Sequence, residues 1–336
     1  MNLPYKNLAL SGGGVLGISY LGMLEYLYQI NLVPQLTKIA GTSAGAITGC
    51  ITAFNLPFSE LKAISDSLDY SKVLVKDEVP EDSSILPRLL PPILRTQLNN
   101  LFDNIDCVYR LIKHYGWHSS SYIYSWLQEQ IEQQFDKTLK PPPYTFADFD
   151  NTEIHKNQRP FKKLYVVATD VSKNCSVVFS SDTTPDLEVA HAVRISASVP
   201  LLFEAISTSV PTGSSEIYVD GGLIYNYPIN LFDKHSPHRE TLGAYFKTDL
   251  PPVIINNLVD FISATISSAT SLQSALFENT KANRFRSIPI LTGEIQPMNF
   301  SVTTGDDTYN LLYHSGYDCT KNFFSRKYKI QINHLV

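Results

Sequence analysis

The chain has 336 residues, 43% of them hydrophobic and 18% charged, and its formal net charge is -5 at pH 7. This charge predicts no overall attraction to nucleic acid or to an anionic bilayer, so any membrane contact must come from a local patch. The chain has four widely spaced cysteines: Cys50, Cys107, Cys175 and Cys319. They form no C-x-x-C pair, so the sequence indicates neither a disulfide framework nor a metal site.

The first predicted element is a short buried strand over residues 8–10, which ends at Gly12, Gly13 and Gly14. Apolar residues then recur at helical spacing from residue 15 to residue 28, so the glycines occupy a strand-to-helix junction. A glycine loop at such a junction presents unblocked backbone N–H groups to an anion.

Residues 12–17 also match the dinucleotide-binding pattern G-x-G-x-x-G. That pattern requires an acidic residue at the end of the next strand to hold the ribose. The next predicted strand instead leads into Gly41 and Ser43, and the nearest acid, Glu25, lies inside the predicted helix. No lysine follows the glycines as in a Walker loop. The sequence therefore disfavours a nucleotide site.

The second predicted strand covers residues 37–40 and leads into Gly41-Thr42-Ser43-Ala44-Gly45. This segment fits the nucleophile-elbow pattern G-x-S-x-G, in which a strand turns sharply into a helix and exposes the serine. Small residues follow at helical spacing up to residue 53, as expected for a helix that packs closely on a sheet. Ser43 would lie at the N-terminus of this helix, where partial positive charge favours an oxyanion.

Prolines recur throughout residues 57–144, and this pattern predicts an insertion or cap bounded by loops. Within it, residues 85–95 are strongly apolar and include Arg88 and Arg95. One hypothesis is a mobile lid whose apolar face meets lipid and whose arginines meet headgroup phosphates. The alternative is a proline-bent segment buried against the core.

Further strand-like runs cover residues 164–169, 176–179, 217–219 and 242–246, and helical patterns cover residues 186–198, 256–282 and 307–324. Strands that alternate with helices predict an α/β fold with a mainly parallel sheet covered on both faces. A chain of this length can form one such unit.

A serine nucleophile needs a base, and none of the histidines lies in a distinctive pattern. Asp220 offers a carboxylate instead, at the end of a predicted strand and followed by Gly221 and Gly222. A buried aspartate is a stronger base than a free one, because desolvation disfavours its charged form. A later histidine could also complete a Ser-Asp-His order: His235, His238 or His314. However, the α/β-hydrolase fold needs more strands before its elbow than this chain provides.

Three motifs in this order, Ser11-Gly12-Gly13-Gly14, the elbow around Ser43, and Asp220-Gly221-Gly222, resemble the patatin-like phospholipase family. The segments 145–149, 195–203 and 222–228, the last with its Asn-x-Pro, are also similar to the family, so the likeness spans residues 8–228. One departure is Leu16, where many members carry arginine or lysine. It bears on the anchoring of the loop and on headgroup preference, and it leaves the backbone donors intact.

The resemblance implies a three-layer α/β/α patatin-like fold with a helical cap, and a lipid acyl hydrolase of the phospholipase A or lysophospholipase type. It implies that Ser43 is the nucleophile, that Asp220 is the general base, and that backbone N–H groups of Gly12, Gly13 and Gly14 form the oxyanion hole. It requires no cofactor and no metal, and its partner is a phospholipid or other acyl lipid at a membrane surface.

We expect one catalytic domain over residues 1–336, with the cap over residues 57–144 and a C-terminal extension over residues 250–336 packed on the core. The N-terminus has no secretory signal pattern, which predicts a cytoplasmic protein that visits membranes transiently; an effector exported without a cleaved signal would look the same. A second class of function is also open: a lipid-binding or signalling module with the same fold that hydrolyses lipid slowly until an activator, a protein or a ligand, orders its lid.

Overall fold

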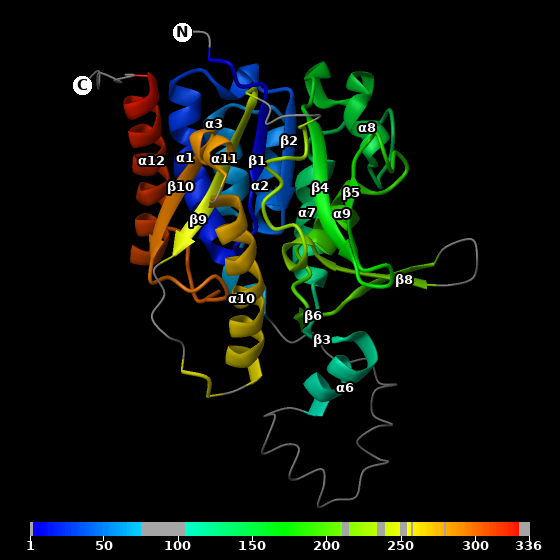
Figure 1. Ribbon diagram of the computed structural model, residues 1–336. Helices are drawn as coiled ribbons and strands as arrows, with labels where there is room; N and C mark the ends of the chain where they lie inside the picture. Colours follow the sequence, from blue (N-terminus) through cyan, green and yellow to red (C-terminus); the bar gives the residue numbers. More distant parts are fainter. Residues whose placement is uncertain are drawn as a thin grey trace, which may run out of the picture.

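The structure is a computed structural model that describes residues 3–74, 105–209, 215–233, 239–248, 254–256, 258–278 and 280–328. Its central sheet is formed by β1 (Asn7–Leu10), β2 (Lys38–Thr42), β4 (Lys163–Asp170), β5 (Cys175–Phe179), β7 (Ile206–Ser209), β8 (Ser215–Asp220), β9 (Thr241–Thr248) and β10 (Ser287–Gly293). The strand order is β10-β9-β1-β2-β4-β8-β7, and β5 pairs with β4 (Figure 1). Neighbours from β10 to β4 are parallel, whereas β5, β8 and β7 add antiparallel pairs.

Every strand predicted from the sequence occurs in this sheet, and the predicted mainly parallel α/β architecture is confirmed. The prediction missed β7, β10 and a separate pair, β3 (Gly116–His118) with β6 (Leu201–Phe203). β10 contains Pro289, which weakens a strand pattern in the sequence. The proline is tolerated because β10 pairs only with β9, at the edge of the sheet.

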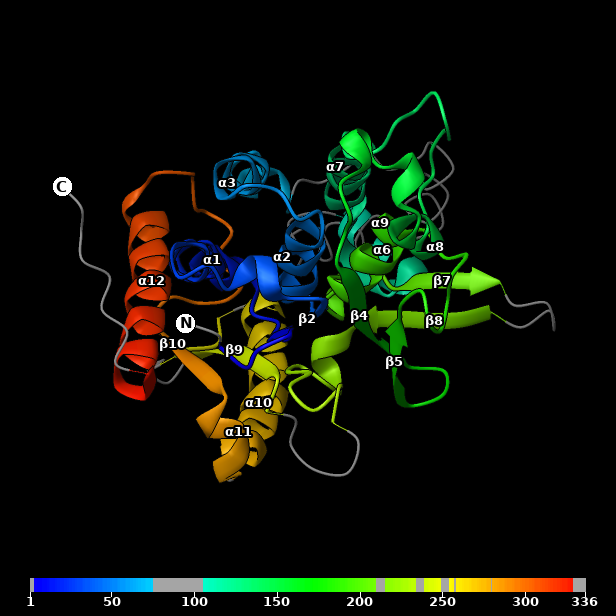
Figure 2. The same cartoon turned by 90° about the horizontal axis from the view of Figure 1, so that it is seen from above.

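Helices cover both faces of the sheet (Figure 2). On one face lie α1 (Ser19–Gln29), α2 (Ala44–Ala53), α3 (Phe58–Asp66) and α12 (Asp307–Tyr328). On the other lie α10 (Leu258–Glu278) and α11 (Lys281–Phe285). Towards β4 and β8 the fold adds α6 (Ile105–His114), α7 (Ser121–Glu132), α8 (Phe146–Asp150) and α9 (Val189–Ser196). Short 3-10 helices complete the elements: η1 (Gly14–Ile18), η2 (Val33–Gln35), η3 (Tyr70–Lys72), η5 (Thr152–Ile154), η6 (Lys156–Gln158) and η7 (Gly221–Leu223).

The contact between α1 and α12 depends on two glycines. A Cβ atom added to Gly22 would lie 1.9 Å from the Tyr313 carbonyl oxygen, and one added to Gly316 would lie 1.8 Å from the Ser19 carbonyl oxygen. The two backbones therefore approach more closely than any side chain would allow. This packing fixes the helix that follows the glycine loop.

The structure describes part of the predicted cap and part of the predicted C-terminal extension. In residues 57–144, α3 packs against α1 and α2, and α7 packs against α9. Residues 85–95 lie outside the described residues, so the lid hypothesis stays a prediction. In residues 250–336, β10 joins the central sheet and α12 packs on α1. None of the helices in the described ranges is both long enough and apolar enough to cross a bilayer.

Candidate active site

The turn between β2 and α2 holds Ser43 in a strained backbone conformation, with φ 53° and ψ -122°. Both flanking glycines are required by close backbone contacts. A Cβ atom on Gly41 would lie 2.1 Å from the Gly45 carbonyl oxygen, and one on Gly45 would lie 2.5 Å from the Leu10 carbonyl oxygen. The G-x-S-x-G segment therefore forms a sharp strand-to-helix turn with a non-glycine residue at positive φ.

Ser196, the last residue of α9, holds this turn in place. Its hydroxyl accepts a hydrogen bond from the Ser43 backbone N–H at 2.9 Å and donates one to the Val167 carbonyl of β4 at 2.6 Å. Ser196 is completely buried. No local signal in the sequence indicates this role, because the two serines are 153 positions apart.

We predict that Ser196→Ala lowers the free energy of unfolding by about 1–3 kcal/mol, because it leaves the buried Ser43 N–H without an acceptor. Ser198→Ala is the matched control, because it also removes a buried hydroxyl. The Ser198 hydroxyl donates to the Arg194 carbonyl, and in the variant this carbonyl still accepts from the Ala197 N–H. Urea denaturation of both variants measures the difference. Equal losses in the two variants would show that the bridge to Ser43 adds nothing.

Asp220 lies at the end of β8, and only 4% of its surface is exposed. Its Oδ1 atom accepts a hydrogen bond from the Gly222 N–H at 2.6 Å, whereas Oδ2 has no hydrogen-bond partner among the described residues. Burial raises the pKa of the Asp220 carboxyl to about 7, although the Ser43 hydroxyl and the Gly222 N–H, which favour the charged form, act to lower it. A carboxyl with this pKa can accept a proton near neutral pH.

The glycine loop between β1 and η1 offers two open backbone donors. The Gly12 N–H donates to the Asn226 carbonyl at 3.1 Å. In contrast, no acceptor for the N–H of Gly13 or of Gly14 occurs in the part of the chain that the structure describes. Gly14 has φ +55°, and a Cβ atom on it would lie 2.1 Å from the Pro297 carbonyl oxygen.

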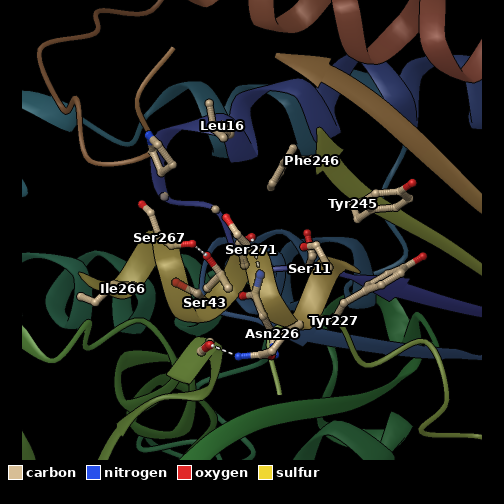
Figure 3. Close-up of a pocket in the computed structure, with 18 of the residues that line it drawn as sticks. Ser11, Leu16, Ser43, Asn226, Tyr227, Tyr245, Phe246, Ile266, Ser267 and Ser271 are labelled. Carbon is tan, nitrogen blue, oxygen red and sulfur yellow. Dashed lines mark hydrogen bonds between the residues drawn. The ribbon is translucent and has the colours of Figure 1, made fainter. Parts of the chain in front are cut away.

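All the predicted site residues line one cavity of about 310 Å³. Gly12, Gly13 and Gly14 come from the first loop, Ser43 from the elbow and Asp220 from the end of β8. The helix α10 lines the same cavity, and Figure 3 shows its residues Ile266, Ser267 and Ser271 together with Ser43.

None of the histidines that the structure describes lines this cavity, and His314 is exposed on α12. The other two histidines of the α/β-hydrolase alternative, His235 and His238, lie outside the described residues. No group of side chains suited to a metal ion occurs among the residues that were placed. Of the described residues that form the cavity wall, Asp220 alone carries a carboxylate.

A family model described as patatin-like phospholipase matches residues 8–233, which include every residue of this site. The chain belongs to the patatin-like phospholipase family. The family assignment confirms the resemblance found in the sequence and argues against both the nucleotide-binding and the α/β-hydrolase alternatives.

Several viral and bacterial proteins are similar along most of the chain. Uncharacterized protein R571 of Acanthamoeba polyphaga mimivirus is 26% identical over 90% of this chain and 89% of its own length. Probable lipid hydrolase 463L of Invertebrate iridescent virus 6 is 25% identical over 79% of this chain and 82% of its own length. The crystal structure of VipD from Legionella pneumophila shares the fold, with a TM-score of 0.58 and 23% identity, over 96% of this chain and 67% of VipD.

Within this patatin-like fold, Asn226 ties the glycine loop to the segment after Asp220. Its carbonyl accepts from Gly12, and its side-chain amide donates weakly to the Gly12 carbonyl at 3.4 Å. The side chain of Gln273 on α10 accepts from the Asn226 N–H at 2.8 Å and donates to the Gly222 carbonyl at 2.9 Å. The Asn-x-Pro segment was recognisable in the sequence by resemblance, whereas Gln273 was missed.

Leu16, the departure from the usual basic residue, is buried and lines the cavity (Figure 3). Other contacts anchor the loop in this chain. The Val15 N–H donates to the Pro297 carbonyl at 2.9 Å, and the Tyr20 hydroxyl donates to the Ser11 carbonyl at 2.9 Å. The loop is therefore held on both sides without a charged residue at this position.

Proposed function

We propose that this patatin-like protein is a phospholipase A or lysophospholipase that cleaves fatty-acyl esters with Ser43 and Asp220. The observation that carries the proposal is the convergence of three features in one cavity: the strained Ser43 elbow, the carboxyl of Asp220 with its pKa raised to about 7, and the open N–H groups of Gly13 and Gly14. A nucleophile, a base and oxyanion donors together suffice for acyl transfer.

In the proposed mechanism, Asp220 takes the Ser43 proton as Oγ attacks the ester carbonyl carbon. The N–H groups of Gly13 and Gly14 stabilise the tetrahedral oxyanion, and each donor contributes about 3 kcal/mol to lowering the barrier. Because the Gly12 N–H is engaged by Asn226, Gly12 contributes by allowing the close approach of the loop to Ser43: a Cβ atom on Gly12 would lie 3.0 Å from the Ser43 Cβ atom.

The intermediate then collapses, and the proton on Asp220 passes to the departing alkoxide oxygen. Water attacks the resulting acyl-serine, again with Asp220 as the base, and the free fatty acid leaves. These residues supply every proton transfer that the cycle requires.

The proposal is tested by incubating the protein with mixed vesicles of phosphatidylcholine, phosphatidylglycerol and lysophosphatidylcholine and identifying the products by mass spectrometry. Free fatty acid and the matching lysolipid or glycerophospho compound are the expected products. A fluorophosphonate probe should also label Ser43. An unlabelled protein that releases no fatty acid would contradict the proposal and favour a signalling module that waits for an activator.

Lys247 favours a phospholipid over a neutral acyl lipid. It is the basic side chain among the described residues that line the cavity, it is exposed, and it has no hydrogen bond or ion pair there. An ammonium group at this position can meet the lipid phosphate while the ester lies at Ser43.

We predict that Lys247→Gln lowers the rate on phospholipid vesicles by about threefold to tenfold, because it removes one charged contact to phosphate. The rate on a neutral monoacylglycerol should change little. Lys247→Arg, which keeps the charge, should retain the rate on phospholipid. A parallel loss on both substrates would assign Lys247 no part in headgroup recognition.

A further inference from the structure

A second cavity adjoins Ser43 and lies between α2, α3 and α7. Gly14, Ser43 and Val199 line both cavities. None of the described residues that line the second cavity is charged. Its apolar wall includes Ile18, Leu21, Leu68, Ile123, Trp126 and Phe300.

One face of α2 forms the floor of this cavity. Ala44, Ile47, Thr48 and Ile51 lie at helical spacing from Ser43, so they share the face that begins at the elbow. From Ser43 to Ile51 the helix rises about 12 Å at 1.5 Å per residue. The lining of the cavity therefore extends along α2 from Ser43.

Two of the polar groups in the wall are already bonded within the protein. The Trp126 Nε1–H donates to the Ser67 hydroxyl at 3.0 Å, and the Ser65 hydroxyl donates to the Leu61 carbonyl at 3.1 Å. Water entering this space would find few hydrogen-bond partners, whereas an apolar chain would lose none.

The first cavity differs in its chemistry. Its wall is mixed: apolar side chains such as Leu16, Phe246 and Met298 lie beside Asp220, Asn226, Lys247, Gln273 and the serines of α10. It is called the polar cavity below because it contains charged groups and the second cavity does not. The two cavities meet at Ser43, and only the first contains charged groups, so the acyl chain of a lipid suits the second cavity and its headgroup side suits the first.

We propose that the second cavity binds the fatty-acyl chain of the scissile ester and sets the chain length that the enzyme prefers. The inference rests on the proposed function. The ester carbonyl lies at the junction formed by Gly14 and Ser43, and the headgroup side of the lipid occupies the polar cavity. The apolar cavity has a volume of about 70 Å³, room for roughly five water-sized groups, so short to medium acyl chains fit better than long ones.

Thr48 is the position at which to test this assignment, because it is half-buried, lies midway along the floor and is not part of the proposed chemistry. The substrates are the p-nitrophenyl esters of acetate, butyrate, octanoate and palmitate, dispersed in detergent. The wild-type rate should peak at butyrate or octanoate.

Thr48→Phe fills the cavity and should lower the rate on octanoate and palmitate by about tenfold or more, with less than about a twofold change on acetate. Thr48→Ala opens it and should shift the preferred ester to a longer chain. Because the two variants are expected to move the preference in opposite directions, a general loss of folding cannot imitate the result.

Ser267→Phe is the matched control, since it narrows the polar cavity from the α10 side instead. It should slow the phospholipid more than the simple esters and leave their chain-length order unchanged. A chain-length order that changes in Ser267→Phe but not in Thr48→Phe would place the acyl chain in the polar cavity and overturn the inference. If no ester is cleaved in a manner that depends on Ser43, the proposed function itself fails, which is a different outcome.

Discussion

Replacing Ser43 with alanine should reduce fatty-acid release from phospholipid vesicles by at least about 1,000-fold, because the proposed acyl-enzyme cannot form without Oγ. Folding should be unaffected. The Ser43 N–H bonds to Ser196, and the Ser43 carbonyl accepts from Ala46 and Ile47, and alanine keeps all three of these backbone interactions. Fatty-acid release measured by mass spectrometry, together with the circular dichroism spectrum, tests both parts of the prediction.

Ser271→Ala provides the control for this experiment, because Ser271 lines the same cavity from α10. Its rate should stay within about threefold of the wild-type rate, since it lies outside the proposed chemistry. Full activity in Ser43→Ala would end the assignment of the nucleophile, and loss of activity in Ser271→Ala alone would move it to α10.

A third variant at the elbow separates strain from chemistry. Ser43→Gly should be as inactive as Ser43→Ala but more resistant to denaturation. A non-glycine residue held at a φ of 53° costs about 1–3 kcal/mol in strain, and glycine adopts this conformation without that cost. The elbow would then be a site where stability is given up for the exposure of one hydroxyl.

The sequence predicted those parts of the site that local pattern determines. Glycines at a strand-to-helix junction and a serine between two glycines are local signals, and both segments form the turns that were expected of them. Strands such as β1 and β4 were also predictable, because each contains a short run of buried apolar residues.

The contacts that hold the turns together could not be predicted in this way. Ser196 and Gln273 act through hydrogen bonds to segments far away in the sequence, and nothing in their local context predicts these contacts. Asn226 was recognisable by resemblance, but its contact with Gly12 was not. The place of β9 beside β1 is also a product of tertiary packing, since these strands are separated by most of the chain. The raised pKa of Asp220 depends on the near-complete burial of its side chain. The strand pattern suggested this burial but could not give its extent.

Replacing Asp220 with asparagine should lower the rate of fatty-acid release by about 100- to 10,000-fold, the usual contribution of a general base. Asparagine keeps the shape of the side chain, and its carbonyl oxygen can still accept from the Gly222 N–H. The loss would therefore report proton transfer and not a displaced loop.

The pH dependence of the wild type gives an independent check. The base must be ionised, and the pKa of Asp220 is about 7, so the rate on p-nitrophenyl butyrate should rise through neutral pH and level off above it. Each pH unit below the pKa should lower the rate about tenfold. The residual rate of Asp220→Asn should not show this titration, whereas a wild-type rate that stays flat across neutral pH would show that Asp220 does not act as the base.

The same burial predicts that Asp220→Asn is more stable than the wild type at neutral pH. In the unfolded chain an aspartate ionises near its ordinary pKa of 3.8, whereas the folded protein holds the proton up to about pH 7. The folded state therefore binds more protons between these values, and its stability falls as the pH rises through that window. By this linkage the ionised carboxylate costs at most roughly 4 kcal/mol above pH 7, and asparagine removes the cost. Denaturation midpoints should be equal at acidic pH and diverge in favour of the variant as the pH rises; a variant that is less stable throughout would mean that the Asp220 carboxylate is structurally required.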